Sequence, residues 1–98
     1  WTEYMENIIG SDTPIKRRLM SIRTSRNYCP PYYVPQLLEY LEKCDNPDIQ
    51  VALFEALGWR RYSYMAPRIA AFAKACSEDS RYAEPVRKEA LKTYNRLK

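Results

Sequence analysis

The sequence predicts an all-α fold, an α–α superhelix of about three stacked antiparallel helix pairs. One helix pattern occurs three times: a branched apolar residue, a polar or basic residue, and then apolar or small residues at the fifth and sixth positions. The copies begin at Ile15, Ile49 and Val86, each one or two residues after a proline. Successive copies start about 35 residues apart, a period typical of helical repeats that stack side by side.

A second helix pattern alternates with the first and supplies the other half of each pair. Its two copies open with Val34-Pro35 and Ala66-Pro67, so the proline takes the same position in both. Proline is tolerated in the first turn of a helix, where its missing N–H would have no partner anyway. The chain has only two glycines and no sustained alternation of apolar and polar residues, so strands are not expected.

Six helices are expected, each with apolar residues at helical spacing. The first covers residues 1–9 and stops at Gly10, and the second covers about 13–26 and stops before the prolines at 30 and 31. The third covers about 33–43, and the fourth covers about 48–57 and ends at Gly58. The fifth runs from about Met65 to Cys76, and a polar loop then leads to the sixth, over about 85–97.

The apolar stripe of each helix gives the expected core. In the first two helices it consists of Trp1, Met5, Ile8, Ile9, Ile15, Leu19 and Ile22. In the next two it consists of Val34, Leu37, Leu38, Leu41, Ile49, Ala52, Leu53, Ala56 and Leu57. In the last two it consists of Met65, Ile69, Phe72, Cys76, Val86, Ala90, Leu91, Tyr94 and Leu97. Stacked helix pairs would bury these stripes as one continuous core.

The length of 98 residues fits a single domain, with approximate repeats at 1–26, 32–58 and 63–98. Because the chain opens at Trp1 rather than Met, we expect a fragment of a longer protein or a processed product. Apolar residues make up 46% and charged residues 29%, which fits a folded globular chain. No apolar run is long enough to cross a bilayer, so membrane insertion is not expected.

The proline-led copies resemble HEAT repeats, in particular the short bacterial HEAT-like repeats of the armadillo-type α-solenoid family. The third copy carries the likeness best, through Glu84-Pro85-Val86-Arg87, and the second copy supplies Asn46-Pro47-Asp48-Ile49 and the ending Ala56-Leu57-Gly58. The resemblance implies a curved superhelix whose proline-led helices line a concave surface, and a scaffolding role. It also implies that Arg87 joins a ladder of contacts between repeats, in which Gln50, at the equivalent position, cannot make the charged contact.

The composition argues against an enzyme. The chain has no histidine, which removes the commonest general base, and two glycines cannot build a phosphate-binding loop. Cys29, Cys44 and Cys76 are far apart in the sequence, and without histidine they do not make an ordinary zinc ligand set. We therefore expect no catalytic residue, no cofactor and no metal.

Basic residues gather on the proline-led helices and suggest a partner-binding face. The net charge is +4, and the second helix carries five basic residues with no acid between them. We expect a protein partner, an acidic one if these charges take part, with nucleic acid as the alternative on the same face. A solvated helix surface with no specific role also accounts for such charges. The expected contact residues are Arg17, Arg18, Arg23, Gln50, Arg61, Tyr64, Lys88 and Lys92.

The segment between the fourth and fifth helices, Trp59 to Tyr64, is rich in tryptophan, arginine and tyrosine. These residue types dominate the hot spots of protein interfaces. We expect Trp59 itself to pack under the next helix pair, as large aromatic side chains usually do. This leaves Arg61 and Tyr64 as the candidates for contact with a partner.

Overall fold

The computed structural model describes residues 14–27, 33–61 and 63–97. The regular elements in these ranges are all α-helices, and none of the described residues forms a strand. The helices are α2 (Ile15–Asn27), α3 (Val34–Lys43), α4 (Pro47–Leu57), α5 (Ala66–Ser77) and α6 (Glu84–Leu97). The first expected helix and the two prolines that follow α2 lie outside the described residues. The all-α prediction is thus confirmed for the described part of the chain.

The helix starts follow the prolines that predicted them. A proline occupies the first turn of α3, α4 and α5, where no backbone donor is lost to the helix. Asn46 caps α4, because its Oδ1 accepts hydrogen bonds from the backbone N–H groups of Asp48, at 3.0 Å, and Ile49, at 3.3 Å. Gly58 follows the last residue of α4, as expected.

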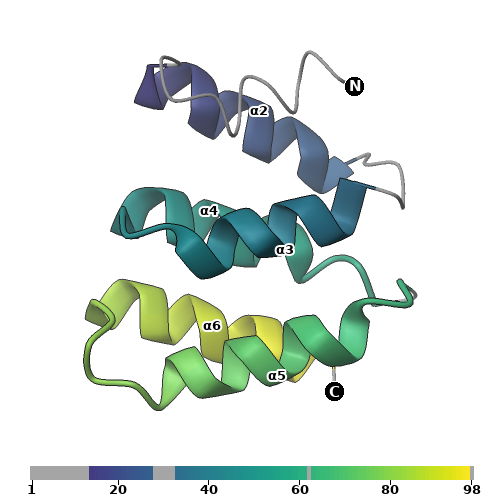
Figure 1. Cartoon of the computed structure of the whole chain (residues 1–98), viewed down its shortest axis with the longest axis vertical. Helices are drawn as coiled ribbons and strands as arrows, with labels where there is room; N and C mark the ends of the chain where they lie inside the picture. The colour runs from purple at the N-terminus through teal and green to yellow at the C-terminus, as the bar shows by residue number, and fades with distance from the viewer. Residues whose placement is uncertain (1–13, 28–32, 62, 98) are drawn as a thin grey trace.

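The three proline-led helices lie side by side. Helix α4 is central, because it packs against α2, α3 and α6, while α5 packs mainly against α6 (Figure 1). Figure 1 shows three tiers along the longest axis: α2, then α3 with α4, then α5 with α6. In that view α3 and α5 lie in front of α4 and α6. This arrangement places the start of α6 beside the start of α4, and the two helices run in the same direction.

The core lies between these tiers and is built from the predicted stripes. Its fully buried side chains include Ile22, Leu37, Leu38, Leu41, Leu53, Phe54, Leu57, Ile69 and Val86. The rings of Phe54 and Phe72 stack with centroids 5.9 Å apart, which joins α4 to α5. Buried Thr93 donates a hydrogen bond from Oγ1 to the carbonyl oxygen of Phe54, at 2.8 Å, and so fixes α6 against α4.

Three residues expected in the core are largely exposed. Ile15 is 49% exposed because it is the first residue of α2, two turns away from the buried Ile22. Leu91 is 48% exposed because the buried face of α6 consists of Val86, Ala90 and Thr93. Leu91 lies at the border of this face. Trp59 is 52% exposed, so its ring is not buried under the next helix pair, although Arg96 of α6 lies over it.

Candidate interaction surface

The expected contact residues on α2 divide into exposed and half-buried side chains. Arg17 and Arg23 are exposed, as predicted. Arg18 is half-buried, and its Nη1 donates a hydrogen bond to the hydroxyl of Tyr40 on α3, at 3.0 Å. Arg18 therefore helps to hold α2 against α3 and is less accessible to a partner than its neighbours.

Gln50 is not an exposed contact residue, and this part of the prediction is wrong. Its side chain is only 5% exposed, and its Nε2 donates a hydrogen bond to the carbonyl oxygen of Cys44, at 2.6 Å. The amide thus satisfies a backbone carbonyl in the turn between α3 and α4, where an unpaired carbonyl would be costly. Gln50 is a structural residue of that turn.

The positive charge expected across the proline-led helices is not continuous. Lys88 and Lys92 are exposed, but each has a nearby carboxylate on α6: Lys88 lies 3.3 Å from Glu84, and Lys92 lies 3.9 Å from Glu89. Helix α4, which lies between α2 and α6, contains two acidic residues and no Lys or Arg. A hollow of about 340 Å³ lies on the surface formed by α2, α4 and α6, and its lining has mixed charge. The lining residues are Leu19, Arg23, Asp48, Val51, Ala52, Glu55 and Pro85.

A second hollow, of about 520 Å³, lies where α4 and α6 end. It is lined by Gly58, Trp59, Arg61, Asn95 and Arg96, and we call this group the Trp59 corner. The guanidinium of Arg96 lies over the ring of Trp59, 5.0 Å from its centroid. Contact at this distance is a cation–π interaction, which attracts the two side chains without using the N–H groups of the guanidinium. Exposed Tyr64, with 70% of its side chain accessible, follows in the same loop.

Several hydrogen bonds hold the loop that carries the corner. The backbone N–H of Arg60 donates to the carbonyl of Leu57, at 3.0 Å, which continues the turn beyond α4. Ser63 then leads into α5, because its hydroxyl oxygen accepts from the backbone N–H of Met65, at 3.1 Å. On the other side, Arg96 Nη1 lies 4.0 Å from Glu89 Oε1, at the limit of an ion pair. Contacts within the α4–α5 loop therefore hold Trp59, and the contact with Glu89 on α6 holds Arg96.

The contact between Trp59 and Arg96 could have been predicted from the repeat register of the sequence. Trp59 and Arg96 occupy equivalent positions in the second and third copies, each ten residues after the branched residue that starts the copy. Parallel neighbouring helices bring equivalent positions together, so the repeat register places Arg96 beside Trp59. Arg61, which the sequence did single out, lines the same hollow. Tyr62, from the same segment, lies outside the described residues.

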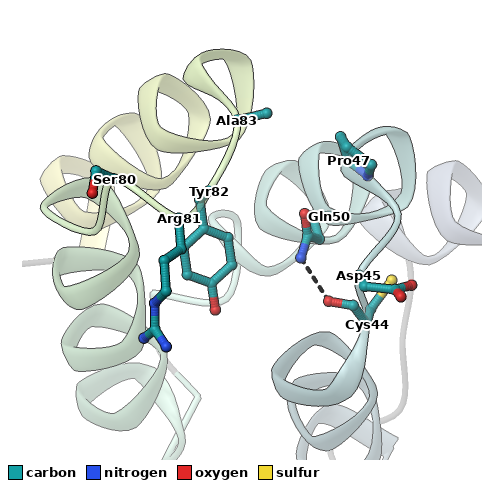
Figure 2. A pocket seen from close by; sticks show the side chains of 8 residues that line it. All are labelled: Cys44, Asp45, Pro47, Gln50, Ser80, Arg81, Tyr82 and Ala83. Atoms are coloured by element: carbon teal, nitrogen blue, oxygen red, sulfur yellow. Dashed lines mark hydrogen bonds between the residues drawn. The ribbon is translucent and has the colours of Figure 1, made fainter.

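A groove of about 590 Å³ lies at the opposite ends of α4 and α6, between the α3–α4 turn and the α5–α6 loop (Figure 2). Figure 2 shows Arg81 and Tyr82 on one side of this groove and Cys44, Asp45 and Gln50 on the other. Arg81 already donates hydrogen bonds to both carboxylate oxygens of Asp79, at 2.7–3.1 Å. These bonds lower the pKa of Asp79, so the pair stays ionised and mutually satisfied at neutral pH.

The nucleophilic groups near this groove are protonated at neutral pH. Burial raises the pKa of the Cys44 and Cys76 thiols above the ordinary value. A hydrogen bond with the Cys76 thiol, followed by partial burial, raises the pKa of Tyr82 to about 12. A reactive cysteine normally has a lowered pKa. Neither thiol therefore has the environment of a catalytic nucleophile, and Cys76 is a buried core residue, as predicted.

Two further findings concern metals and membranes. Among the described residues, no three His, Cys, Asp or Glu side chains are grouped closely enough to hold a metal ion. In the same part of the chain, no helix combines the length and apolar character needed to cross a membrane.

Comparisons with protein-family models, with curated proteins and with solved structures give no match for this chain. The resemblance to HEAT-like repeats therefore stays a prediction from the sequence. What the structure adds is the geometry: parallel neighbouring helices and an arginine–tryptophan corner where two of them end.

Proposed function

We propose that this chain is a non-catalytic protein-interaction module, a segment of a HEAT-like α-solenoid within a scaffold. The observation that carries the proposal is the Trp59 corner, where a half-exposed tryptophan lies under an arginine beside a second arginine. Tryptophan, tyrosine and arginine are the residues most often found at interface hot spots. An exposed tryptophan that is already held in place loses little side-chain freedom when a partner binds.

The repeat pattern and the packing of α2, α4 and α6 support the solenoid part of the proposal. In stacked helix pairs the proline-led helices form one layer, and the ends of successive helices form the edges of that layer. The Trp59 corner lies on such an edge. A partner that follows the edge would contact one turn after another, which is how repeat proteins use extended surfaces.

The non-catalytic part of the proposal rests on side-chain chemistry. The chain has no histidine, and the thiols of Cys44 and Cys76 have raised pKa values. The carboxylate of Asp79 is already bound by Arg81, which lines the larger groove. A catalytic group normally needs an environment that leaves it reactive, and these groups have the opposite environment.

The proposal is tested by affinity capture with the purified domain as bait, followed by a binding measurement on each captured protein. We expect at least one protein whose affinity falls about 30-fold with Trp59→Ala, equivalent to about 2 kcal/mol for a hot-spot residue. Lys43→Ala is the matched control, because Lys43 is exposed and forms an ion pair with Glu39, one turn away on the same helix. Circular dichroism verifies that both variants fold.

Two outcomes would contradict the proposal. One is that every captured protein binds the wild type and the Trp59→Ala variant equally well. The other is that the isolated domain turns over a substrate, since that would require a catalytic site within this chain.

Nucleic-acid binding through the basic face is the alternative. The feature in its favour is α2, whose basic residues have no acid within the helix. It is less favoured because α4, with Asp48 and Glu55, lies next to α2 and interrupts the track that a phosphate backbone would follow. A gel shift at low salt tests it, and binding that weakens steeply with salt would replace the first proposal.

A further inference from the structure

We propose that the Trp59 corner binds an acidic peptide segment of the partner, with Arg61 and Arg96 holding a carboxylate and Trp59 contacting the neighbouring side chain. This inference rests on the proposed function and adds the site and the chemistry of its ligand. It starts from the composition of the hollow. Among the described residues, its lining comprises two arginines, an asparagine, a tryptophan and a glycine, and none of these five is acidic.

The position of Arg96 suits a carboxylate. Its guanidinium lies 5.0 Å from the centroid of the Trp59 ring, and attraction between a guanidinium and an aromatic ring does not consume the N–H donors. Arginine binds carboxylates through two parallel hydrogen bonds from these donors. Glu89, which lies 4.0 Å from Nη1 and is itself largely buried, limits the movement of the side chain. The side chain of Arg96 is therefore restrained before the ligand arrives, which lowers the entropic cost of binding.

The size of the hollow fits a short peptide segment. A volume of about 520 Å³ lies within the range of about 300–1,000 Å³ that is usual for ligand sites. The exposed part of the Trp59 ring offers an apolar surface for a residue next to the carboxylate.

The surroundings favour an acidic peptide over nucleic acid. The carboxyl-terminal ends of α4 and α6 meet at this corner, and their partial negative charge opposes a carboxylate as well as a phosphate, so it does not separate the two ligands. The distribution of cations does, because a nucleic-acid backbone needs several of them along a track and α4 has no basic residue. One carboxylate needs only the donors that the corner supplies.

Three fluorescein-labelled pools of ten-residue peptides test the inference by fluorescence polarisation. Their central pair is Glu-Asp, Gln-Asn or Lys-Arg, and the flanking positions are mixed apolar residues. We expect the acidic pool to bind at least tenfold more tightly than the Gln-Asn pool. Arg61→Gln and Arg96→Gln should each remove most of that preference, while Arg81→Gln, in an exposed arginine at the far ends of α4 and α6, should leave it unchanged.

The inference is overturned if the acidic pool binds no better than the Gln-Asn pool, or if Arg81→Gln reduces binding as much as Arg96→Gln does. A labelled twenty-nucleotide oligo(dT) is the competing probe. Tighter binding of this probe than of the acidic pool, with the same dependence on Arg61 and Arg96, would assign the corner to nucleic acid instead. If a captured protein still depends on Trp59 but no acidic preference exists, only the ligand chemistry fails. If capture does not depend on Trp59, the proposed function fails as well.

Discussion

The two ends of the α4–α6 pair carry hollows of similar volume but different chemistry. At the amino-terminal ends, the polar groups of the 590 Å³ groove are largely satisfied within the chain: Arg81 binds Asp79, and Gln50 binds the Cys44 carbonyl. At the carboxyl-terminal ends, Arg96 lies on the Trp59 ring, and both side chains remain partly accessible. The two hollows therefore differ in the state of their polar groups more than in volume. This difference is the reason why we propose the Trp59 corner, and not the larger groove, as the interaction surface.

The largest difference in stability between the two ends is expected when the Gln50 side chain is removed. Gln50→Ala leaves the Cys44 carbonyl without its donor and opens space in a buried position, so we expect a loss of about 1–3 kcal/mol in the free energy of unfolding. Arg61→Ala, at the other end, should change the same quantity by less than about 0.5 kcal/mol. Urea denaturation of both variants measures the difference. Equal losses would mean that the two ends do not differ in the way described.

A smaller change in the free energy of unfolding is expected when the pH is raised above 10. Because the pKa of Tyr82 is raised from its ordinary value of 10.0 to about 12, the folded state retains a proton that the unfolded state releases. The stabilisation is therefore complete below pH 10 and is lost as the pH rises towards 12. The raised thiol pKa values of Cys44 and Cys76 act in the same direction from about pH 9.

Tyr82→Phe isolates the tyrosine contribution, because the variant cannot ionise at this position. We expect the unfolding free energy of the variant to fall less steeply between pH 10 and 12 than that of the wild type. Tyr64→Phe, in an exposed tyrosine of the loop between α4 and α5, should retain the wild-type slope. Equal slopes in all three proteins would show that the hydrogen bond with Cys76 does not act on Tyr82.

Much of the fold could be predicted because local signals and helical periodicity agree. The prolines gave the starts of α3, α4 and α5, and the stripe of Val34, Leu37, Leu38 and Leu41 is buried as expected. The errors concern residues whose burial depends on neighbouring helices. Gln50 is buried because a carbonyl in the preceding turn needs its amide, and no periodicity in the sequence contains that information.

The candidate surface was predicted only in part. Arg61 and Tyr64 were selected by residue type, and both are exposed. Trp59 was expected in the core because aromatic burial is the general rule, but its side chain is 52% exposed and lies beneath an arginine at the end of α6. The repeat register could have placed Arg96 beside Trp59. It could not have shown that the space around them stays open, because that depends on the lengths of α4, α6 and the loop that joins α4 to α5.

The most direct test of the Trp59 corner is an NMR titration of the ¹⁵N-labelled domain with the acidic peptide pool. We expect chemical-shift changes at the Trp59 indole N–H, the Gly58 amide and the Asn95 side-chain amide, with the resonances of Gln50 and Tyr82 unchanged. Shifts centred on Gln50 and Tyr82, or the absence of any shift at the Trp59 indole, would contradict the assignment of this corner as the interaction surface.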